Sequence, residues 1–251
     1  MSSSPPAVLA CAASDPTGGA GLQADLLTIA ALGCHPLSVL TALTVQDTSG
    51  VVELQAVESR LVESQARCLL AELPVAAIKL GVLGSADNAR ALAALLKAQR
   101  APLVVDPVIA SARGDPLASE ASLAAMQQEI LPLATVATPN LLEAKRLGGA
   151  ARLLELGCRY VLVTGTHADT LEVVNTLYDR SGVVREDRWQ RLPGSYHGSG
   201  CTLASAIAAL LARGRDLPHA VGEAQEFTWR ALAAGFRPGT GQYLPQRFFR
   251  Q

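Results

Sequence analysis

This sequence of 251 residues has few aromatic side chains, no run of lysine and arginine, and no apolar stretch long enough to span a bilayer. Its formal net charge is −1, so a broad electrostatic attraction to nucleic acid is not expected. The first residues, Met1–Pro6, lack the basic start of a secretory signal. We therefore expect a cytoplasmic protein with neither nucleic acid nor membrane as a partner.

Cysteine is also scarce, and its spacing excludes two common uses. The residues are odd in number, widely separated and without a CxxC pair, which argues against a disulfide framework and against a zinc site. They favour a reducing compartment. The five are Cys11, Cys34, Cys68, Cys158 and Cys201.

Internal repeats, low-complexity tracts and linkers are missing too, so we expect one domain over residues 1–251, with 1–6 flexible. Strand-like and helix-like segments alternate along it, which predicts right-handed crossovers and a mostly parallel sheet covered on both faces. Strands are expected at 8–12, 38–45, 51–57, 76–80, 103–105, 134–137 and 160–163, with an antiparallel pair at 175–178 and 183–189. Helices are expected at 19–32, 59–73, 87–98, 123–130, 199–212 and 217–234.

Polar residues gather just after several of these strands. They are Ser14-Asp15, Asp106-Pro107, Thr138–Asn140 and Thr164-Gly165. Ligands of open α/β sheets bind beyond the carboxyl ends of the strands. These stretches are therefore expected to line one cleft.

The turn Gly198-Ser199-Gly200-Cys201 precedes an apolar helix. Unpaired N–H groups and the helix dipole at such a start can hold an anion, or the charge that develops on a phosphoryl group during transfer. Cys201 lies in the first turn, where a thiolate is favoured and can act as base or nucleophile. The alternative is a glycine turn capped by Ser199, with Cys201 as a small packing residue.

A second glycine-rich stretch, Ser14–Asp25, follows the first strand. Its small residues allow a ligand to approach the backbone closely, and Asp15 can accept a hydrogen bond from a substrate hydroxyl. The stretch matches neither a Walker A sequence nor GxGxxG, so a plain strand-to-helix turn is the alternative. Gln46 ends a later strand, and its carboxamide can pair side-on with an aminopyrimidine edge; otherwise it is a solvated side chain.

Acidic residues follow two other strands. Asp106 and Glu143 are candidates for acting on ATP phosphates through Mg²⁺. The pair Asn140 and Glu143 also has the spacing of a capping box. His167 and His197 lie in the same loop segments without a metal-ligand partner, so a structural or substrate-orienting role is expected for them.

Five motifs occur in one order along the chain: SDPTGGAGLQAD (14–25), TALTVQDTSGV (41–51), VVDPV (104–108), TPNLLEA (138–144) and HGSGCTLASAIA (197–208). Together they resemble the hydroxymethylpyrimidine/phosphomethylpyrimidine kinases of thiamine biosynthesis, in the ribokinase-like superfamily. The resemblance implies a three-layer α/β/α sandwich that phosphorylates 4-amino-5-hydroxymethyl-2-methylpyrimidine, and then its monophosphate, from ATP with Mg²⁺. A homodimer is also implied, and the β-rich stretch 38–57 is the expected surface.

The resemblance also implies roles for individual residues. Gln46 would hold the pyrimidine with help from Asp15 and Gly21, while Val82 and Val108 would pack on its ring.

At the phosphates, Asp106 and Glu143 would lie near the metal, directly or through water. Asn140, Thr164 and Gly165 would bind ATP.

The glycine turn completes the implied site. Gly198, Ser199 and Gly200 would form an anion hole. Cys201 stands where sugar kinases of this superfamily carry an aspartate base, which favours the pyrimidine branch and makes Cys201 the expected base.

Some positions depart from the family pattern. Thr164 stands where a lysine is common, which removes a cation from the expected phosphate site. Val82 replaces a common methionine, and the connection from Leu147 to Leu153 is short. Two alternatives therefore stay open: a pyridoxal kinase of the same superfamily, and a pyrimidine-binding protein that has lost catalysis.

Overall fold

The computed structural model describes residues 4–111 and 114–249. Residues 1–3 of the segment expected to be flexible lie outside this range. Pro6, at the end of that segment, accepts a hydrogen bond through its carbonyl oxygen from the backbone N–H of His35 (2.9 Å).

One nine-stranded sheet runs through the molecule in the order β3-β2-β1-β4-β5-β6-β7-β8-β9. Six strands from β2 to β7 in this order are parallel, whereas β3 and the pair β8 and β9 are antiparallel to their neighbours. The mostly parallel sheet and the late antiparallel pair are thus confirmed. The strands are β1 (Ala7–Ser14), β2 (His35–Gln46), β3 (Val51–Ala56), β4 (Val75–Leu80), β5 (Leu103–Val105), β6 (Val136–Ala137), β7 (Tyr160–Val163), β8 (Glu172–Asp179) and β9 (Gly182–Gln190).

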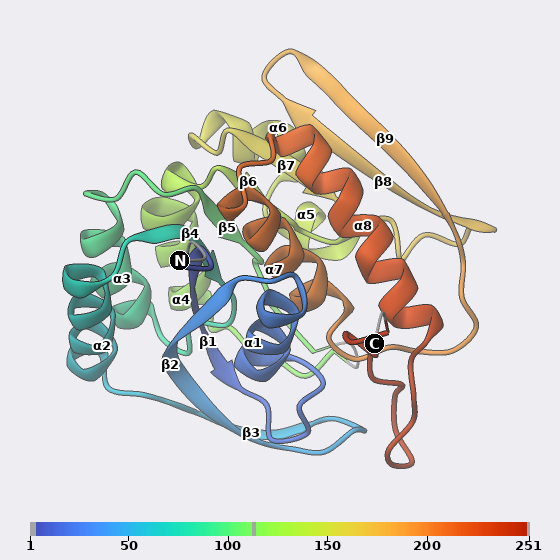
Figure 1. Cartoon of the computed structure of the whole chain (residues 1–251), viewed down its shortest axis with the longest axis horizontal. Helices are drawn as coiled ribbons and strands as arrows, with labels where there is room; N and C mark the ends of the chain where they lie inside the picture. Colours follow the sequence, from blue (N-terminus) through green and yellow to red (C-terminus); the bar gives the residue numbers. More distant parts are fainter. Residues whose placement is uncertain (1–3, 112–113, 250–251) are drawn as a thin grey trace.

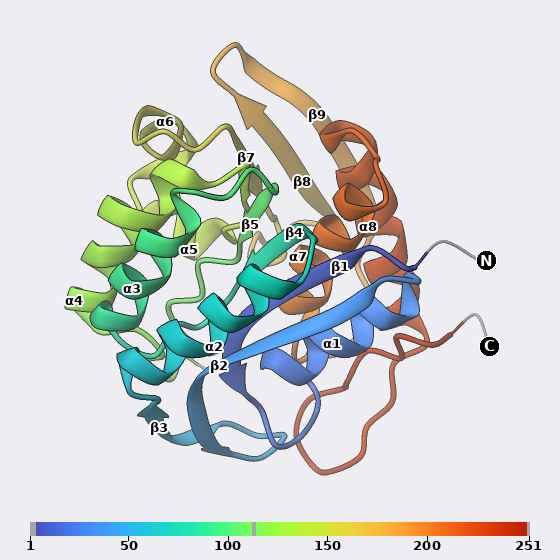
Figure 2. The same ribbon diagram turned by 60° about the vertical axis from the view of Figure 1, so that its left-hand side comes forward.

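Helices cover both faces of this sheet, as the two views show (Figure 1, Figure 2). One face packs against α2, α3, α4 and α6, and the other against α1, α7 and α8. The three-layer α/β/α arrangement is therefore confirmed. The helices are α1 (Gly21–Ala31), α2 (Ser59–Glu72), α3 (Ala86–Leu96), α4 (Glu120–Ala125), α5 (Leu141–Arg146), α6 (Gly149–Glu155), α7 (Ser199–Ala212) and α8 (Leu217–Ala233).

Strand β1 shows why its sequence is apolar throughout. Leu9 and Cys11 pack into the core under α2 and α3, while Val8 and Ala10 pack into the core under α1 and α7. A strand buried on both faces reads as a continuous apolar run instead of an alternating one. Burial of a side chain such as Leu9 contributes about 2 kcal/mol.

The helix predicted at 123–130 differs in detail. It begins earlier, because the hydroxyl of Ser119 accepts a hydrogen bond from the backbone N–H of Ser122 (3.1 Å) and caps α4. After Ala125 the chain continues as one π-helical turn, Met126–Ile130. The short helices α5 and α6 were not among the predicted ones. Within the described residues, no helix combines the length and apolarity needed to cross a membrane.

Candidate active site

A cavity of about 1200 Å³ opens at the carboxyl ends of the parallel strands. The polar stretches that follow β1, β5, β6 and β7 all contribute to its wall, so the predicted single cleft is confirmed. Nearly all the candidate residues line it: Asp15, Gly21, Gln46, Val82, Asp106, Val108, Asn140, Glu143, Thr164, Gly198, Ser199, Gly200 and Cys201.

Gly165 is the exception among the candidates. Its backbone N–H donates to Asn175 Oδ1 (3.0 Å), and a Cβ added to it would lie 2.1 Å from the carbonyl oxygen of Val174. The glycine is therefore required by close packing against β8. The prediction that Gly165 contacts the phosphates is corrected accordingly, because the residue stands behind the cavity wall.

The glycine turn at the start of α7 faces this cavity. Gly198 is the N-cap in a left-handed conformation (φ +81°), and no side chain caps the helix, so the alternative of a Ser199 cap is wrong. A Cβ at Gly198 would lie 1.9 Å from the carbonyl oxygen of Gly19, so only glycine fits. The first-turn N–H groups of α7 lack intrahelical partners and remain available to an anion.

Cys201 is half-buried in the first turn of α7, but its thiol is not activated. Burial raises its pKa to about 12; Lys79 lowers it, while Asp106 and Asp25 raise it further. The expectation of a favoured thiolate is therefore wrong for the chain without ligands, because desolvation and two carboxylates outweigh the helix start.

Two buried carboxyl groups, those of Asp106 and Glu143, line the cavity. Asp106 is 4 % exposed, and among the described residues nothing hydrogen bonds to its Oδ2. Burial raises the pKa of Asp106 to about 6. For Glu143, burial and then the Asp106 charge raise the pKa to about 8.

Glu143 also forms the predicted capping box of α5. Its Oε2 accepts from the backbone N–H of Asn140 (2.9 Å), while Asn140 Oδ1 accepts from the backbone N–H of Glu143 (3.0 Å). The capping box is confirmed, and it fixes the Glu143 carboxylate in the cavity wall. Glu143 therefore both caps α5 and lines the cavity.

This pair of carboxylates fits a divalent cation. The Asp106 charge raises the pKa of the desolvated Glu143, and Asp106 Oδ2 has no protein donor among the described residues. A cation would stabilise both charged forms. Within the described residues no third acidic, histidine or cysteine side chain joins them as a metal cluster, which suits Mg²⁺, since Mg²⁺ completes its shell with water and substrate phosphate.

A buried ion pair beneath the glycine turn was missed by the sequence analysis. Lys79 in β4 is 0 % exposed, and its Nζ lies 2.8 Å from both carboxylate oxygens of Asp25 in α1. Ser205 in α7 donates its hydroxyl to Asp25 Oδ1 (2.8 Å). Lys79 also lines the cavity and lowers the pKa values of Cys201 and Asp106. The available signal was a lysine inside the apolar run Val75–Leu80.

Arg247 was missed as well. Its guanidinium is buried, and it donates to the carbonyl oxygens of Gly18 (3.4 Å) and Gly19 (2.5 Å) and to Thr202 Oγ1 (3.2 Å). The C-terminal segment thereby fastens the first glycine loop to α7.

Thr164 lies beside the capping box, where its carbonyl oxygen accepts from the backbone N–H of Leu141 (3.2 Å). It supplies no charge, but other cations line the cavity: Lys145, Arg146 and Arg191. Arg191 in addition holds the loop after β7 through three carbonyl oxygens, those of residues 166, 168 and 170.

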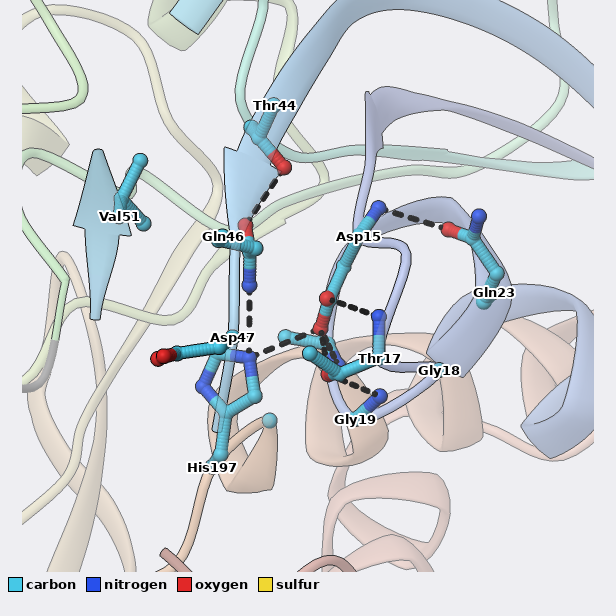
Figure 3. A network of polar contacts seen from close by, with 12 residues as sticks. Asp15, Thr17, Gly18, Gly19, Gln23, Thr44, Gln46, Asp47, Val51 and His197 are labelled. Atoms are coloured by element: carbon cyan, nitrogen blue, oxygen red, sulfur yellow. Dashed lines mark hydrogen bonds and ion pairs between the residues drawn. The ribbon is translucent and has the colours of Figure 1, made fainter. Parts of the chain in front are cut away.

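At the opposite end of the cavity, Asp15, His197 and Gln46 form one polar network (Figure 3). His197 Nε2 lies 2.8 Å from Asp15 Oδ2. The two terminal atoms of the Gln46 amide lie 3.2 Å from His197 Nε2 and 2.7 Å from Thr44 Oγ1. The predicted orienting role of His197 thus acquires a specific partner.

The Asp15 carboxylate accepts four hydrogen bonds from the protein, three of them at Oδ2. Besides His197, it accepts from the backbone N–H groups of Thr17 (2.8 Å) and Ala20 (2.7 Å) and from the Thr17 hydroxyl (3.0 Å). Burial alone would raise the pKa of Asp15, but the hydrogen bond from His197 and that from Ala20 lower it below its usual value. Asp15 therefore organises the loop. The predicted contact to a substrate hydroxyl stays a prediction, with Oδ1, which accepts a single hydrogen bond from Thr17 N–H, as the oxygen that could make it.

A family model described as phosphomethylpyrimidine kinase matches residues 15–246. The chain is 42 % identical over 253 residues to the hydroxymethylpyrimidine/phosphomethylpyrimidine kinase of Streptomyces coelicolor, which covers 94 % of this chain and 92 % of that relative.

Two solved structures are similar along most of the chain. The pyridoxal kinase from Staphylococcus aureus in complex with AMP-PCP and pyridoxal superposes with a TM-score of 0.88 at 29 % identity, covering 98 % of this chain and 94 % of that one. The phosphomethylpyrimidine kinase from Clostridium difficile superposes with a TM-score of 0.79 at 31 % identity, covering 90 % and 99 %.

Proposed function

This chain belongs to the phosphomethylpyrimidine kinase family, and we propose that it transfers the γ-phosphate of ATP to 4-amino-5-hydroxymethyl-2-methylpyrimidine and then to its monophosphate, within thiamine biosynthesis. The observation that carries the proposal is the meeting of Gln46 and the uncapped start of α7 in one cavity. An amide that offers a donor and an acceptor suits an aminopyrimidine, and a bare helix start suits a phosphoryl group.

At the pyrimidine end, Gln46 pairs with the substituted ring edge while Val82 and Val108 pack on the ring faces. Gly21 lines the same wall, and the backbone itself requires glycine there, since a Cβ would lie 2.5 Å from the carbonyl oxygen of Ala13. Asp15 contributes by holding the loop and His197.

At the phosphate end, the N–H groups of Gly198, Ser199 and Gly200 receive the transferring phosphoryl group. Asn140 and Thr164 lie along the nucleotide phosphates.

Asp106 and Glu143 would hold Mg²⁺, directly or through water. When bound, the ion neutralises charge on the ATP phosphates. The unpartnered Oδ2 of Asp106 and the raised pKa values support this assignment.

Cys201 lies at the start of α7, beside Asp106. We propose that its thiol acts on the substrate hydroxyl. The thiol positions the hydroxyl, and its minor thiolate form, which has lost its own proton to solvent, accepts the hydroxyl proton late in the transfer. Phosphoryl transfer depends mainly on positioning and charge stabilisation, so a sparsely populated base is compatible with turnover.

A pyridoxal kinase is the second candidate, favoured by the similarity to the Staphylococcus aureus structure. Gln46 argues for the pyrimidine, because pyridoxal has no amine to match its acceptor. An ATP-consumption assay with both alcohols side by side tests the ranking. We expect the pyrimidine to give the higher kcat/KM, and a higher value for pyridoxal reverses the assignment.

We further propose a single-domain cytoplasmic enzyme that forms a homodimer through the β2–β3 hairpin. Leu43, Val45 and Val52 on this hairpin are exposed apolar side chains, which supports an interface there. Light scattering on the purified chain distinguishes dimer from monomer.

A further inference from the structure

The hydrogen bonds around Gln46 contain a conflict that reveals how the site chooses its substrate. Gln46 Nε2 lies 3.2 Å from His197 Nε2 (Figure 3). A hydrogen bond between these two nitrogens requires a lone pair on His197 Nε2. The same ring nitrogen lies 2.8 Å from Asp15 Oδ2, and an ionised carboxylate only accepts hydrogen bonds. His197 Nε2 must therefore carry a hydrogen and donate it to Asp15.

Thr44 shows the same conflict from the other side. Its single hydroxyl hydrogen is within reach of the carbonyl oxygen of Ser14 (2.8 Å) and of Gln46 Oε1 (2.7 Å). The single hydroxyl hydrogen can form a well-aligned hydrogen bond with only one of these two acceptors. Rotation of the Gln46 amide by half a turn relieves both conflicts. The oxygen then shares the His197 N–H with Asp15 in a three-centre hydrogen bond, and the nitrogen then donates to a lone pair of Thr44.

We propose that His197, oriented by Asp15, fixes the Gln46 amide with its oxygen toward the histidine and its nitrogen toward Thr44, and so selects an aminopyrimidine over its oxo counterpart. In this orientation one lone pair of Oε1 and one N–H of Nε2 stay free for a ligand. The exocyclic amine binds on the His197 side and the ring nitrogen on the Thr44 side. This inference rests on the proposed function, in which Gln46 holds the pyrimidine.

The oxo counterpart presents the opposite pattern, with a carbonyl oxygen next to a ring N–H. It pairs with Gln46 only after the amide turns back, which places two N–H groups against each other at His197. His197 also immediately precedes Gly198, so the histidine that orients the base-reading amide is joined directly to the turn proposed to receive the phosphoryl group. His197 is a positioning residue, since it acts on the substrate through Gln46.

The test compares kcat/KM for the aminopyrimidine alcohol with kcat/KM for its 4-oxo counterpart. We expect His197→Ala to lower this ratio about tenfold, as the loss of one orienting hydrogen bond allows. His197→Gln should keep the ratio, because its amide nitrogen can donate to Asp15 in place of the ring nitrogen. His219→Ala is the matched control: it removes an exposed histidine paired with Asp216, and it should change nothing.

A merely structural role for His197 would lower both kcat/KM values together and leave their ratio unchanged, and that outcome overturns the proposal. Asp15→Asn is a second variant if His197→Ala fails to fold. It no longer obliges His197 Nε2 to carry the hydrogen, so the ratio should fall as well. An unchanged ratio in this variant also counts against the proposal.

Gln46→Ala separates this inference from the proposed function. If that variant leaves the KM of the aminopyrimidine unchanged, Gln46 does not hold the ring and the functional assignment of Gln46 fails. If it raises KM while His197→Ala keeps the wild-type ratio, only the role of His197 fails. In the Gln46→Ala background we expect His197→Ala to have no further effect on the ratio.

Discussion

At the pyrimidine end of the cavity, formed by Asp15, His197 and Gln46, the Asp15 carboxylate accepts four hydrogen bonds from the protein. At the phosphate end, formed by Asp106, Glu143 and the start of α7, Asp106 Oδ2 accepts none from the described residues. The pKa of Asp15 is lowered, whereas those of Asp106 and Glu143 are raised. The carboxylate at one end is satisfied by the protein before a ligand binds, whereas the carboxylate at the other keeps an oxygen without a donor.

This difference matches the two tasks of a small-molecule kinase. Recognition of a neutral ring needs donors and acceptors held in fixed positions, and a satisfied network supplies them. Transfer of a phosphoryl group needs charge that arrives with the substrate, so the protein leaves Asp106 Oδ2 without a donor until then. The following variants test this contrast.

The largest effect is expected from Asp106→Asn. Loss of this carboxylate should lower kcat by about a thousandfold, because the proposed cation loses a ligand. The free energy of unfolding should stay equal or rise, since an unpartnered buried charge disappears. Steady-state kinetics and urea unfolding measure the two quantities. A strong loss of stability would show that Asp106 is already satisfied, and Asp87→Asn on the exposed side of α3 is the control.

Cys201→Ala should lower kcat by about ten- to a hundredfold, with little change in the KM for ATP. The thiol acts on the substrate hydroxyl and not on nucleotide binding. Cys201→Ser separates positioning from proton transfer, since a hydroxyl keeps a donor but is a weaker acid than a thiol. Unchanged kcat in Cys201→Ala removes the proposed role.

Lys79 is buried in an ion pair with Asp25, and Lys79→Met should cost about 3–5 kcal/mol in the free energy of unfolding. The variant leaves Asp25 buried without its cation. The double variant Lys79→Met with Asp25→Leu should recover most of this loss, because a buried ion pair is replaceable by apolar packing. Lys97→Met removes an exposed pair with Glu129 and should cost less than about 1 kcal/mol. If Lys79→Met alone proves as stable as Lys97→Met, then the buried pair of Lys79 and Asp25 does not stabilise the fold as proposed.

Glu143 provides a pH-dependent test. The folded chain keeps this carboxyl group protonated up to a pKa of about 8, whereas its ordinary value is 4.5. Between these values the folded state binds more protons than the unfolded state, so the free energy of unfolding falls as pH rises. The slope is at most about 1.4 kcal/mol per pH unit for one group.

Urea unfolding from pH 5 to pH 8 measures this slope, and Glu143→Gln should flatten it. Glu129→Gln, at an exposed glutamate, should not. An equal slope in wild type and Glu143→Gln would place the titration elsewhere.

Local sequence signals identified most of the residues that line the cavity. They did not identify the buried contacts that join residues far apart in the sequence. The turn before α7, the Asn140–Glu143 capping box and the polar strand ends are each encoded within a few neighbouring residues. The pairs Lys79–Asp25, Arg247–Gly19 and His197–Gln46 join positions 54, 228 and 151 residues apart. Only the folded chain brings them together.

The same limit explains the wrong expectation for Cys201. A helix start lowers a thiol pKa when the site is open. Here Asp25 and Asp106, from other elements, surround a desolvated thiol. The sequence near Cys201 carries no sign of them.

The most direct test of the account is incubation of the chain with Mg-ATP and 4-amino-5-hydroxymethyl-2-methylpyrimidine, with the monophosphate and diphosphate products resolved over time. We expect the monophosphate to appear first and the diphosphate to follow, and both to disappear when Mg²⁺ is removed. Binding of the pyrimidine by calorimetry with neither product formed would contradict the account and leave a pyrimidine-binding protein without catalysis.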